Sequence, residues 1–254
     1  MVAAEDISLL LVALAAFFAG GTIKGAMGFG LPLLAIPAMT AAHSLPMALS
    51  IAVYPVFATN LWQTWSYRAH APRRILPGFL LAGAVGLFSG ALLLGYIREA
   101  IIEIAVGALV LVYLATRGQR RKRPGAGGHP SRFAPLFGFT AGAVHGATGL
   151  SGLVGTPYFH ALDLARPTFI LCNGAMFTLF SILHGPTLTS LGLYQASGVW
   201  IGLAALPTAF LGLWLGGRIG RRLNAERFSR VVVTILRLTA IIPIWNGLRD
   251  ILGG

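Results

Sequence analysis

The chain has 254 residues, of which 56% are hydrophobic and only 10% are charged, and its formal net charge is +12. Soluble domains carry roughly 25% charged residues, so this composition excludes a soluble enzyme, a disordered chain and a disulfide scaffold. Membrane proteins collect Lys and Arg in cytoplasmic loops, so the basic excess predicts a lipid bilayer as partner and no nucleic acid. The single cysteine allows no thiolate metal cage, and we expect neither a metal nor a cofactor.

A membrane-crossing helix needs roughly 20 mostly apolar residues. The stretches that meet this requirement are, in chain order, 7–23, 47–67, 75–96, 99–116, 133–150, 168–189, 196–217 and 227–248. Two further apolar stretches, 25–42 and 152–165, are interrupted by glycine and proline. A signal peptide carries basic residues before its apolar segment, whereas this chain has Glu5 and Asp6 there. We therefore expect the first stretch to remain in the mature protein.

The distribution of Lys and Arg decides whether the two interrupted stretches cross the membrane. If both cross, one face keeps only Arg98 and Arg249, and the other face receives nearly all the remaining loop Arg and Lys residues. Cytoplasmic loops carry such an excess. We therefore predict ten crossings, or their equivalent in paired half-helices, in the inner membrane with both termini outside.

The sequence is duplicated about a glycine-rich break. Residues 24–28 (KGAMG) match residues 145–149 (HGATG) at an offset of 121, and at the same offset Asn60 and Gln63 fall on Ser181 and His184. We predict a first membrane repeat over 1–116, a basic cytoplasmic linker over 117–132 and a second membrane repeat over 133–254.

Five crossings in each repeat is an odd number, so the second repeat must be inverted in the membrane. The expected fold is an all-α membrane protein of two inverted-topology repeats. In such folds broken or re-entrant helices meet at the bilayer midplane and form the substrate site.

The glycine-rich segments 24–37 and 145–157 each carry a proline shortly after the glycines. This pattern is typical of a helix that ends and restarts, and the restarted helix points free N–H groups and the positive end of its dipole at a cavity. The glycines also fit small-residue packing faces between membrane helices, which is the alternative interpretation.

Ionisable residues within apolar spans indicate the charge of the substrate. Lys24, His145 and Arg237 lie inside or beside such spans, and no buried pair of carboxylates is evident. This bias favours an anion over a cation. Alternatively, Lys24 snorkels to the interface and Arg237 binds helix carbonyls.

Polar side chains spaced three apart, as in the pairs Asn60/Gln63 and Ser181/His184, share one helix face and can line the same cavity. Alternatively, they hold helices together. The candidate substrate-binding residues are Lys24, Gly28, Phe29, Gly30, Asn60, Gln63, His145, Gly149, Ser151, Gly152, Ser181 and His184.

The glycine-rich segments ending in proline, together with Asn60-Leu61-Trp62-Gln63, resemble the TauE/SafE sulfite exporter family over about residues 7–248. The resemblance implies a small permease of two homologous halves that moves sulfite or related sulfur-containing and organic anions across the bacterial cytoplasmic membrane. The residues that carry the family motif here are Gly25, Gly28, Gly30, Pro37, Asn60, Gln63, Gly146, Gly149, Ser151, Gly152 and Pro157.

We therefore expect a transporter of small anions that works by alternating access, and not an enzyme; a homodimer is left open. The main rival is a rhomboid-like intramembrane serine protease, because Gly149-Leu150-Ser151-Gly152 has the Gly-x-Ser-Gly form and His184 lies downstream. A second rival is a cation-coupled or proton-coupled carrier, or a channel, on the same scaffold, in which His145 or His184 accepts a proton.

Overall fold

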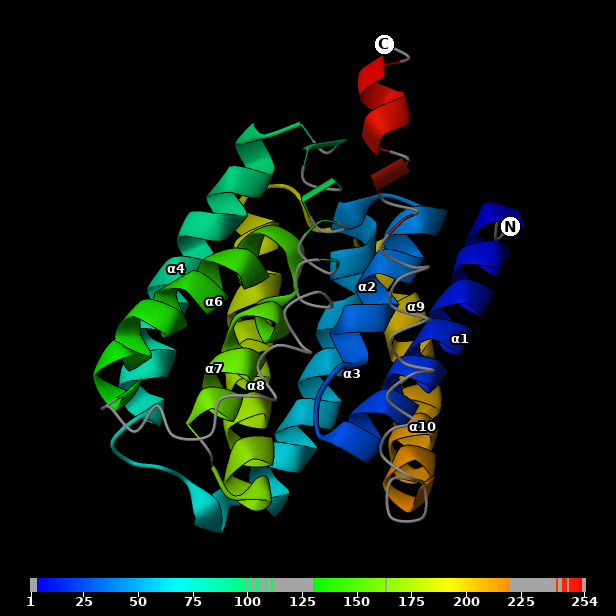
Figure 1. The fold of residues 1–254 in the computed structure, drawn as a ribbon. Helices are drawn as coiled ribbons and strands as arrows, with labels where there is room; N and C mark the ends of the chain where they lie inside the picture. Colours follow the sequence, from blue (N-terminus) through cyan, green and yellow to red (C-terminus); the bar gives the residue numbers. More distant parts are fainter. Residues whose placement is uncertain are drawn as a thin grey trace.

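The computed structural model describes residues 4–98, 100–101, 104–105, 108, 111, 130–162, 164–219, 241, 244–245 and 247–252, and all regular structure in these residues is helical (Figure 1). The α-helices are α1 (Ala4–Met27), α2 (Leu31–Ala42), α3 (Leu45–Ser66), α4 (Leu76–Tyr96), α6 (Ala134–Thr148), α7 (Gly155–Ala161), α8 (Arg166–Ser190), α9 (Ser197–Ala204) and α10 (Leu206–Ile219). Short 3₁₀ helices are η1 (Arg68–His70), η2 (Pro130–Phe133) and η3 (Ser151–Leu153).

Five helical segments of the described chain are long and apolar enough to cross a membrane: Ile7–Met27, Leu45–Ser66, Leu76–Tyr96, Arg166–Ser190 and Ser197–Ile219. The sequence predicted one continuous span over 196–217. In the structure a turn at Ala205 divides this segment into α9 and α10. The predicted spans 99–116 and 227–248 lie mostly outside the described residues.

The helices are interrupted at both glycine-rich segments. After α1 the backbone takes positive φ angles at Gly28 (88°) and Gly30 (111°), and α2 then begins with a proline in its first turn. After α6 the backbone takes a φ of 73° at Gly149, followed by η3 and α7. Residues with a side chain rarely adopt such angles, which explains why glycine occupies these positions.

The two halves of the chain pack against each other through glycines. Gly86 of α4 lies against the carbonyl oxygen of Phe139 in α6, and Gly212 of α10 lies against the carbonyl oxygen of Phe18 in α1. Phe18 and Phe139 are 121 residues apart, which is the offset of the duplicated sequence. Gly86 and Gly212 are 126 apart, because the offset lengthens by a few residues further along each half, so the two contacts correspond. One turn further along, Gly90 meets Ala143 and Gly216 meets Thr22 in the same way. Small residues allow membrane helices to approach this closely.

Helices α3 and α8 run antiparallel at the centre of the molecule. Gly174 of α8 lies against Thr64 of α3, and Gly185 lies against Val53, so the contacts advance along the two helices in opposite directions. At the offset of 121, Val53 corresponds to Gly174 and Thr64 to Gly185. Each of these contacts is therefore the image of the other.

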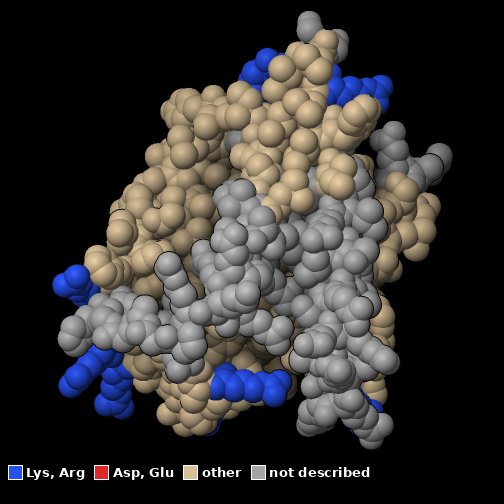
Figure 2. Space-filling view, viewed as in Figure 1, with Lys and Arg blue, Asp and Glu red and all other residues tan. Residues whose placement is uncertain are grey.

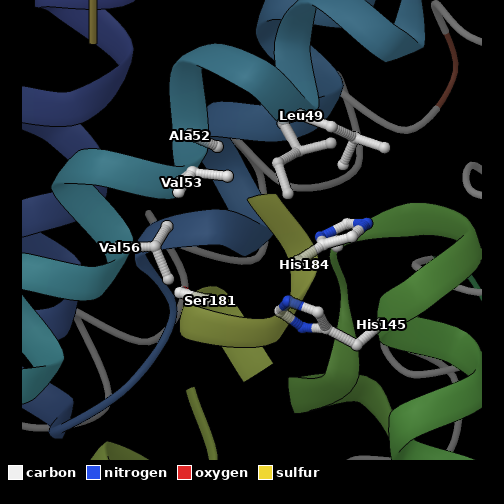
Figure 3. A pocket seen from close by; sticks show the side chains of 9 residues that line it. Leu49, Ala52, Val53, Val56, His145, Ser181 and His184 are labelled. Carbon is white, nitrogen blue, oxygen red and sulfur yellow. The ribbon is translucent and has the colours of Figure 1, made fainter. Parts of the chain in front are cut away.

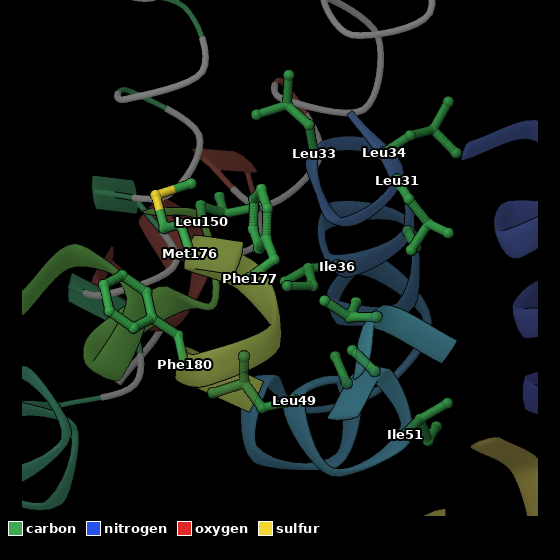
Figure 4. Packing of buried hydrophobic residues seen from close by; sticks show 14 of the residues in the cluster. Leu31, Leu33, Leu34, Ile36, Leu49, Ile51, Leu150, Met176, Phe177 and Phe180 are labelled. Carbon is green, nitrogen blue, oxygen red and sulfur yellow. The ribbon is translucent and has the colours of Figure 1, made fainter. Parts of the chain in front are cut away.

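A buried apolar core fills the space between α2, α3 and α8. It contains Leu31 and Ile36 from α2, Leu49 from α3, and Phe177 and Phe180 from α8 (Figure 4). Leu31 directly follows the first break and Leu150 directly follows Gly149, so this core lies beside both helix breaks.

The described arginines gather at the two ends of the bundle. On the face shown in Figure 2, Lys and Arg atoms lie at its two ends, with uncharged described atoms between them. Arg68, Arg73, Arg74, Arg132, Arg166 and Arg218 follow or precede the helix ends that point downward in Figure 1. Arg98 and Arg249 belong to the upper end, where the N- and C-termini also lie.

Candidate functional site

Lys24 lies in the last turn of α1 and is almost completely buried, with 1% of its surface exposed. Its Nζ donates a hydrogen bond to Thr59 Oγ1 of α3 at 3.0 Å, and the Thr59 hydroxyl in turn donates to the carbonyl oxygen of Pro55. No carboxylate pairs with Lys24 in the part of the chain that the structure describes. An ammonium has three donors, so a charged Lys24 is left short of acceptors.

The two polar residues that the sequence places near Lys24 on α3 differ in their hydrogen bonding. Asn60 is buried and its amide donates to the carbonyl oxygen of Val56 in its own helix at 2.7 Å. Gln63 is also buried, but its Oε1 finds no hydrogen-bond partner among the described residues. Both side chains are buried on α3, neither lines the two cavities described below, and Gln63 is the member of the pair with an unused acceptor.

The two helix breaks meet at a small apolar cavity. Phe29 and Gly30 from the first break and Leu150 and Gly152 from the second line it, together with Phe177 of α8. Its volume of about 10 Å³ is enough for roughly one water molecule. The structure therefore brings together the two segments that the sequence singled out, although Gly28 of the same break instead packs against Ile170.

A second group of predicted residues forms a histidine pocket, defined by His145, Gly149, Ser181 and His184 with their apolar neighbours (Figure 3). The rings of His145 and His184 lie 5.0 Å apart, centroid to centroid, and both are buried. His145 Nδ1 shares a hydrogen bond with Ser151 Oγ at 3.0 Å. His184 Nε2 lies 3.1 Å from the carbonyl oxygen of Gly146, to which it donates.

The histidine pocket opens towards α3, from which aliphatic side chains face the two rings. The remaining lining residues are Ile36, Leu49, Ala52, Val53 and Val56. The cavity holds about 10 Å³, again room for roughly one water molecule. Both cavities as they stand are too small for a substrate anion.

The pairing of Ser151 with His184 required by a rhomboid-like protease is absent, because Ser151 is hydrogen-bonded to His145 instead. His184 uses its Nε2 on a backbone carbonyl. The sequence pattern pointed to His184 because that histidine lies on a later helix. His145 lies only six residues before Ser151, and their contact depends on the turn at Gly149, which the sequence alone does not show.

Thr59 is the partner of Lys24, and sequence reasoning did not single it out. A threonine that bonds the carbonyl four residues earlier in its helix is common, and its second role shows only when the fold brings the last turn of α1 to Thr59. Thr156 and Asn173, which share a 2.6 Å hydrogen bond between α7 and α8, were also not predicted as a pair. Arg237 lies outside the described residues.

These features define a multi-pass, all-helical membrane protein with a buried basic residue next to paired helix breaks. The chain belongs to the sulfite exporter TauE/SafE family, whose family model matches residues 12–242. This confirms the resemblance seen in the sequence and identifies a family of membrane transporters, and nothing in it supports a rhomboid-like protease. No curated protein and no solved structure matches the chain.

Proposed function

We propose that this protein transports small anions, sulfite or related sulfur-containing and organic anions, by alternating access of two inverted repeats in the inner membrane. The observation that carries the proposal is the burial of Lys24 with one neutral hydrogen-bond partner and no described counter-ion. Membership of the sulfite exporter family supports the same substrate class.

The environment of Lys24 favours an anionic guest on physical grounds. A charged group within a bilayer is expensive when unpaired. An anion beside Lys24 would accept the hydrogen bonds that Thr59 leaves unmade and would offset the buried charge. Gly30, the positive-φ residue directly before α2, lines the apolar cavity between the breaks, and the free N–H groups at the start of α2 would add to the attraction.

Two sets of contacts support an inverted repeat. The glycine contacts of α4 with α6 correspond, residue by residue, to those of α10 with α1. The antiparallel crossing of α3 and α8 maps onto itself at the sequence offset of 121. Both patterns are expected of two halves related by a two-fold axis in the membrane plane.

The small size of both cavities supports alternating access over an open channel. Each accommodates roughly one water molecule, so an anion enters only if the helices around the site separate. In an inverted repeat, rocking of one half against the other opens the same site to each side in turn.

Replacement of Lys24 by glutamine tests the proposed role of the buried charge. A hydrogen bond to a charged group contributes about 1.5–3 kcal/mol, so we expect sulfite flux at low concentration to fall roughly tenfold to a hundredfold. Uptake of labelled sulfite into proteoliposomes containing the purified variant measures this loss, and a panel of sulfite, sulfate, thiosulfate, sulfonates and acetate defines the substrate.

Arg98→Gln is the matched control, because it removes the same charge from an exposed position at the end of α4. We expect its flux to equal that of the wild type. Unchanged sulfite flux in Lys24→Gln would show that the buried lysine has no part in binding.

A further inference from the structure

The histidine pocket differs chemically from its counterpart in the first half. At the offset of 121, His145 corresponds to Lys24 and His184 to Gln63. The first half thus has an amine and an amide at these two positions, whereas the second half has two imidazoles that lie in contact. Imidazole is the side chain that changes its charge in the neutral pH range. The two halves are therefore equipped for different ligands.

Each imidazole uses one nitrogen in a hydrogen bond and leaves the other unused. His145 bonds Ser151 through Nδ1, and His184 bonds the Gly146 carbonyl through Nε2. Neither His145 Nε2 nor His184 Nδ1 has a hydrogen-bond partner among the described residues. Both rings line a cavity with room for about one water molecule, through which a proton can reach these nitrogens.

No other charged or titratable group faces the ring pair from the described elements around it. The side chains that line the cavity from α2 and α3 are aliphatic, and α8 contributes Ser181 and the rings of Phe177 and Phe180. Behind α6, α4 packs through glycines. The tyrosine of α7, Tyr158, stacks on Phe137 and Phe79. A proton bound here is thus held by the two imidazoles.

We propose that His145 and His184 form a proton-binding site and that the protein carries this proton in the same direction as its anion. The inference rests on the proposed function. The proton comes from water on the side to which the site is open and binds His184 Nδ1, which has a free lone pair because Nε2 donates to the Gly146 carbonyl; it then returns to water on the opposite side. In the loaded state the positive charge on the histidine pair then accompanies the negative charge of the anion bound beside Lys24.

The proton site and Lys24 are linked through α3. Val56 lines the histidine pocket, and Thr59, three residues further along the same helix, bonds Lys24. Three residues are just under one helical turn, about 4.5 Å along the axis. Because α3 borders both sites, a movement of α3 that opens one changes the other.

The test compares the full-length wild type with His145→Gln and His184→Gln in proteoliposomes. Glutamine bonds through its amide but does not titrate, and the first half already has glutamine at the position equivalent to His184. One measurement is accumulation of labelled sulfite driven by a proton gradient of about one pH unit. The other is exchange of label at equal pH on both sides, between about pH 4 and pH 8. Because sulfite itself binds a proton near neutral pH, all proteins are compared in identical buffers.

We expect the wild type to accumulate sulfite by up to roughly tenfold for each pH unit, the limit for one coupled proton. The glutamine variants should lose this accumulation, and their exchange rates should no longer vary with pH, whatever the absolute rate. Val53→Ala changes the lining of the same cavity without removing an imidazole, so the shape of its pH profile should match the wild type.

Glutamine variants that accumulate sulfite like the wild type, with the same pH profile, overturn the proton site alone. Wild-type flux that ignores the proton gradient overturns it too, without any variant that must fold. Wild-type protein that moves no sulfite at any pH, compared with protein-free vesicles, overturns the proposed function itself.

Discussion

At the residue scale, the Thr59 hydroxyl holds the amine of Lys24 in place. It is the acceptor for Nζ, and it is oriented by its own bond to the carbonyl of Pro55. Because both bonds come from one hydroxyl on a rigid helix, the amine is directed at a fixed point. Thr59 thus acts through Lys24 and need not contact the anion itself.

Thr59→Val removes this hydroxyl and keeps the shape of the side chain. A net hydrogen bond contributes about 0.5–1.5 kcal/mol, so we expect the KM for sulfite to rise roughly threefold to tenfold. Thr59→Ser keeps the hydroxyl and should stay close to the wild type. Measured uptake rates over a range of sulfite concentrations decide this, and an unchanged KM in Thr59→Val would show that Lys24 is positioned by other contacts.

Single residues were predictable where composition already made them unusual. A lysine in an apolar span stands out in any membrane sequence, so Lys24 and its counterpart His145 were identified from position and charge. Their partners were not, because the contact of Lys24 with Thr59 joins residues 35 apart on two helices. Which histidine meets Ser151 likewise depends on the turn at Gly149.

At the scale of elements, the contacts of α1 with α10 and of α4 with α6 depend on glycine at each crossing point. A methyl group at Gly216 would collide with the carbonyl oxygen of Thr22, whereas one at Gly217, the next residue, would meet nothing closer than 4.0 Å. The backbone carbonyl cannot move aside as a flexible side chain can. Adjacent positions on one helix therefore differ sharply in what they tolerate.

Gly216→Ala should lower the free energy of unfolding by about 1–3 kcal/mol, as overpacking does elsewhere. Gly217→Ala is the matched control and should leave stability unchanged or slightly raised, because alanine favours the helix. Unfolding of the purified proteins in mixed micelles, followed by circular dichroism, measures both. Equal stability of the two variants would contradict the packing described for α1 and α10.

The elements were predictable in type, and their breaks were predictable in place. Glycine followed by proline located both interruptions because these residues act on the backbone itself. The turn at Ala205 lies between Gly202 and Pro207, a weaker form of the same signal, and the division between α9 and α10 was missed because 196–217 has the length and composition of one continuous span. The glycines of the two broken segments were given a packing interpretation, but those of α4 were not singled out, and only the fold shows which carbonyl each one meets.

At the scale of the whole molecule, the described arginines indicate how the protein sits in the membrane. Those at the ends of α3, α8 and α10 share one end of the bundle, while Arg98 and Arg249 share the other with both termini. Cytoplasmic faces carry the excess of positive charge. This supports our proposal that the termini lie outside.

Single cysteines at Arg73 and Arg98 test the orientation. Arg98→Cys should react with a membrane-impermeant maleimide in intact cells, and Arg73→Cys should react only after the cells are opened, because the two exposed residues belong to opposite ends. The native Cys172 is buried and serves as an unreactive background. The reverse labelling pattern would place the termini inside.

The packing of first-half helices against second-half helices affects how the protein is made. Chains are synthesised from the N-terminus, and domains generally fold as they emerge. Here α1 must wait for α10, and α4 for α6, before their glycine faces are covered. The newly inserted first half is thus an incomplete product that other membrane proteins or quality-control proteases can engage, and its lifetime is set by the translation of the second. We expect a gene split within the predicted linker, residues 117–132, to yield a working protein only if both pieces are produced together.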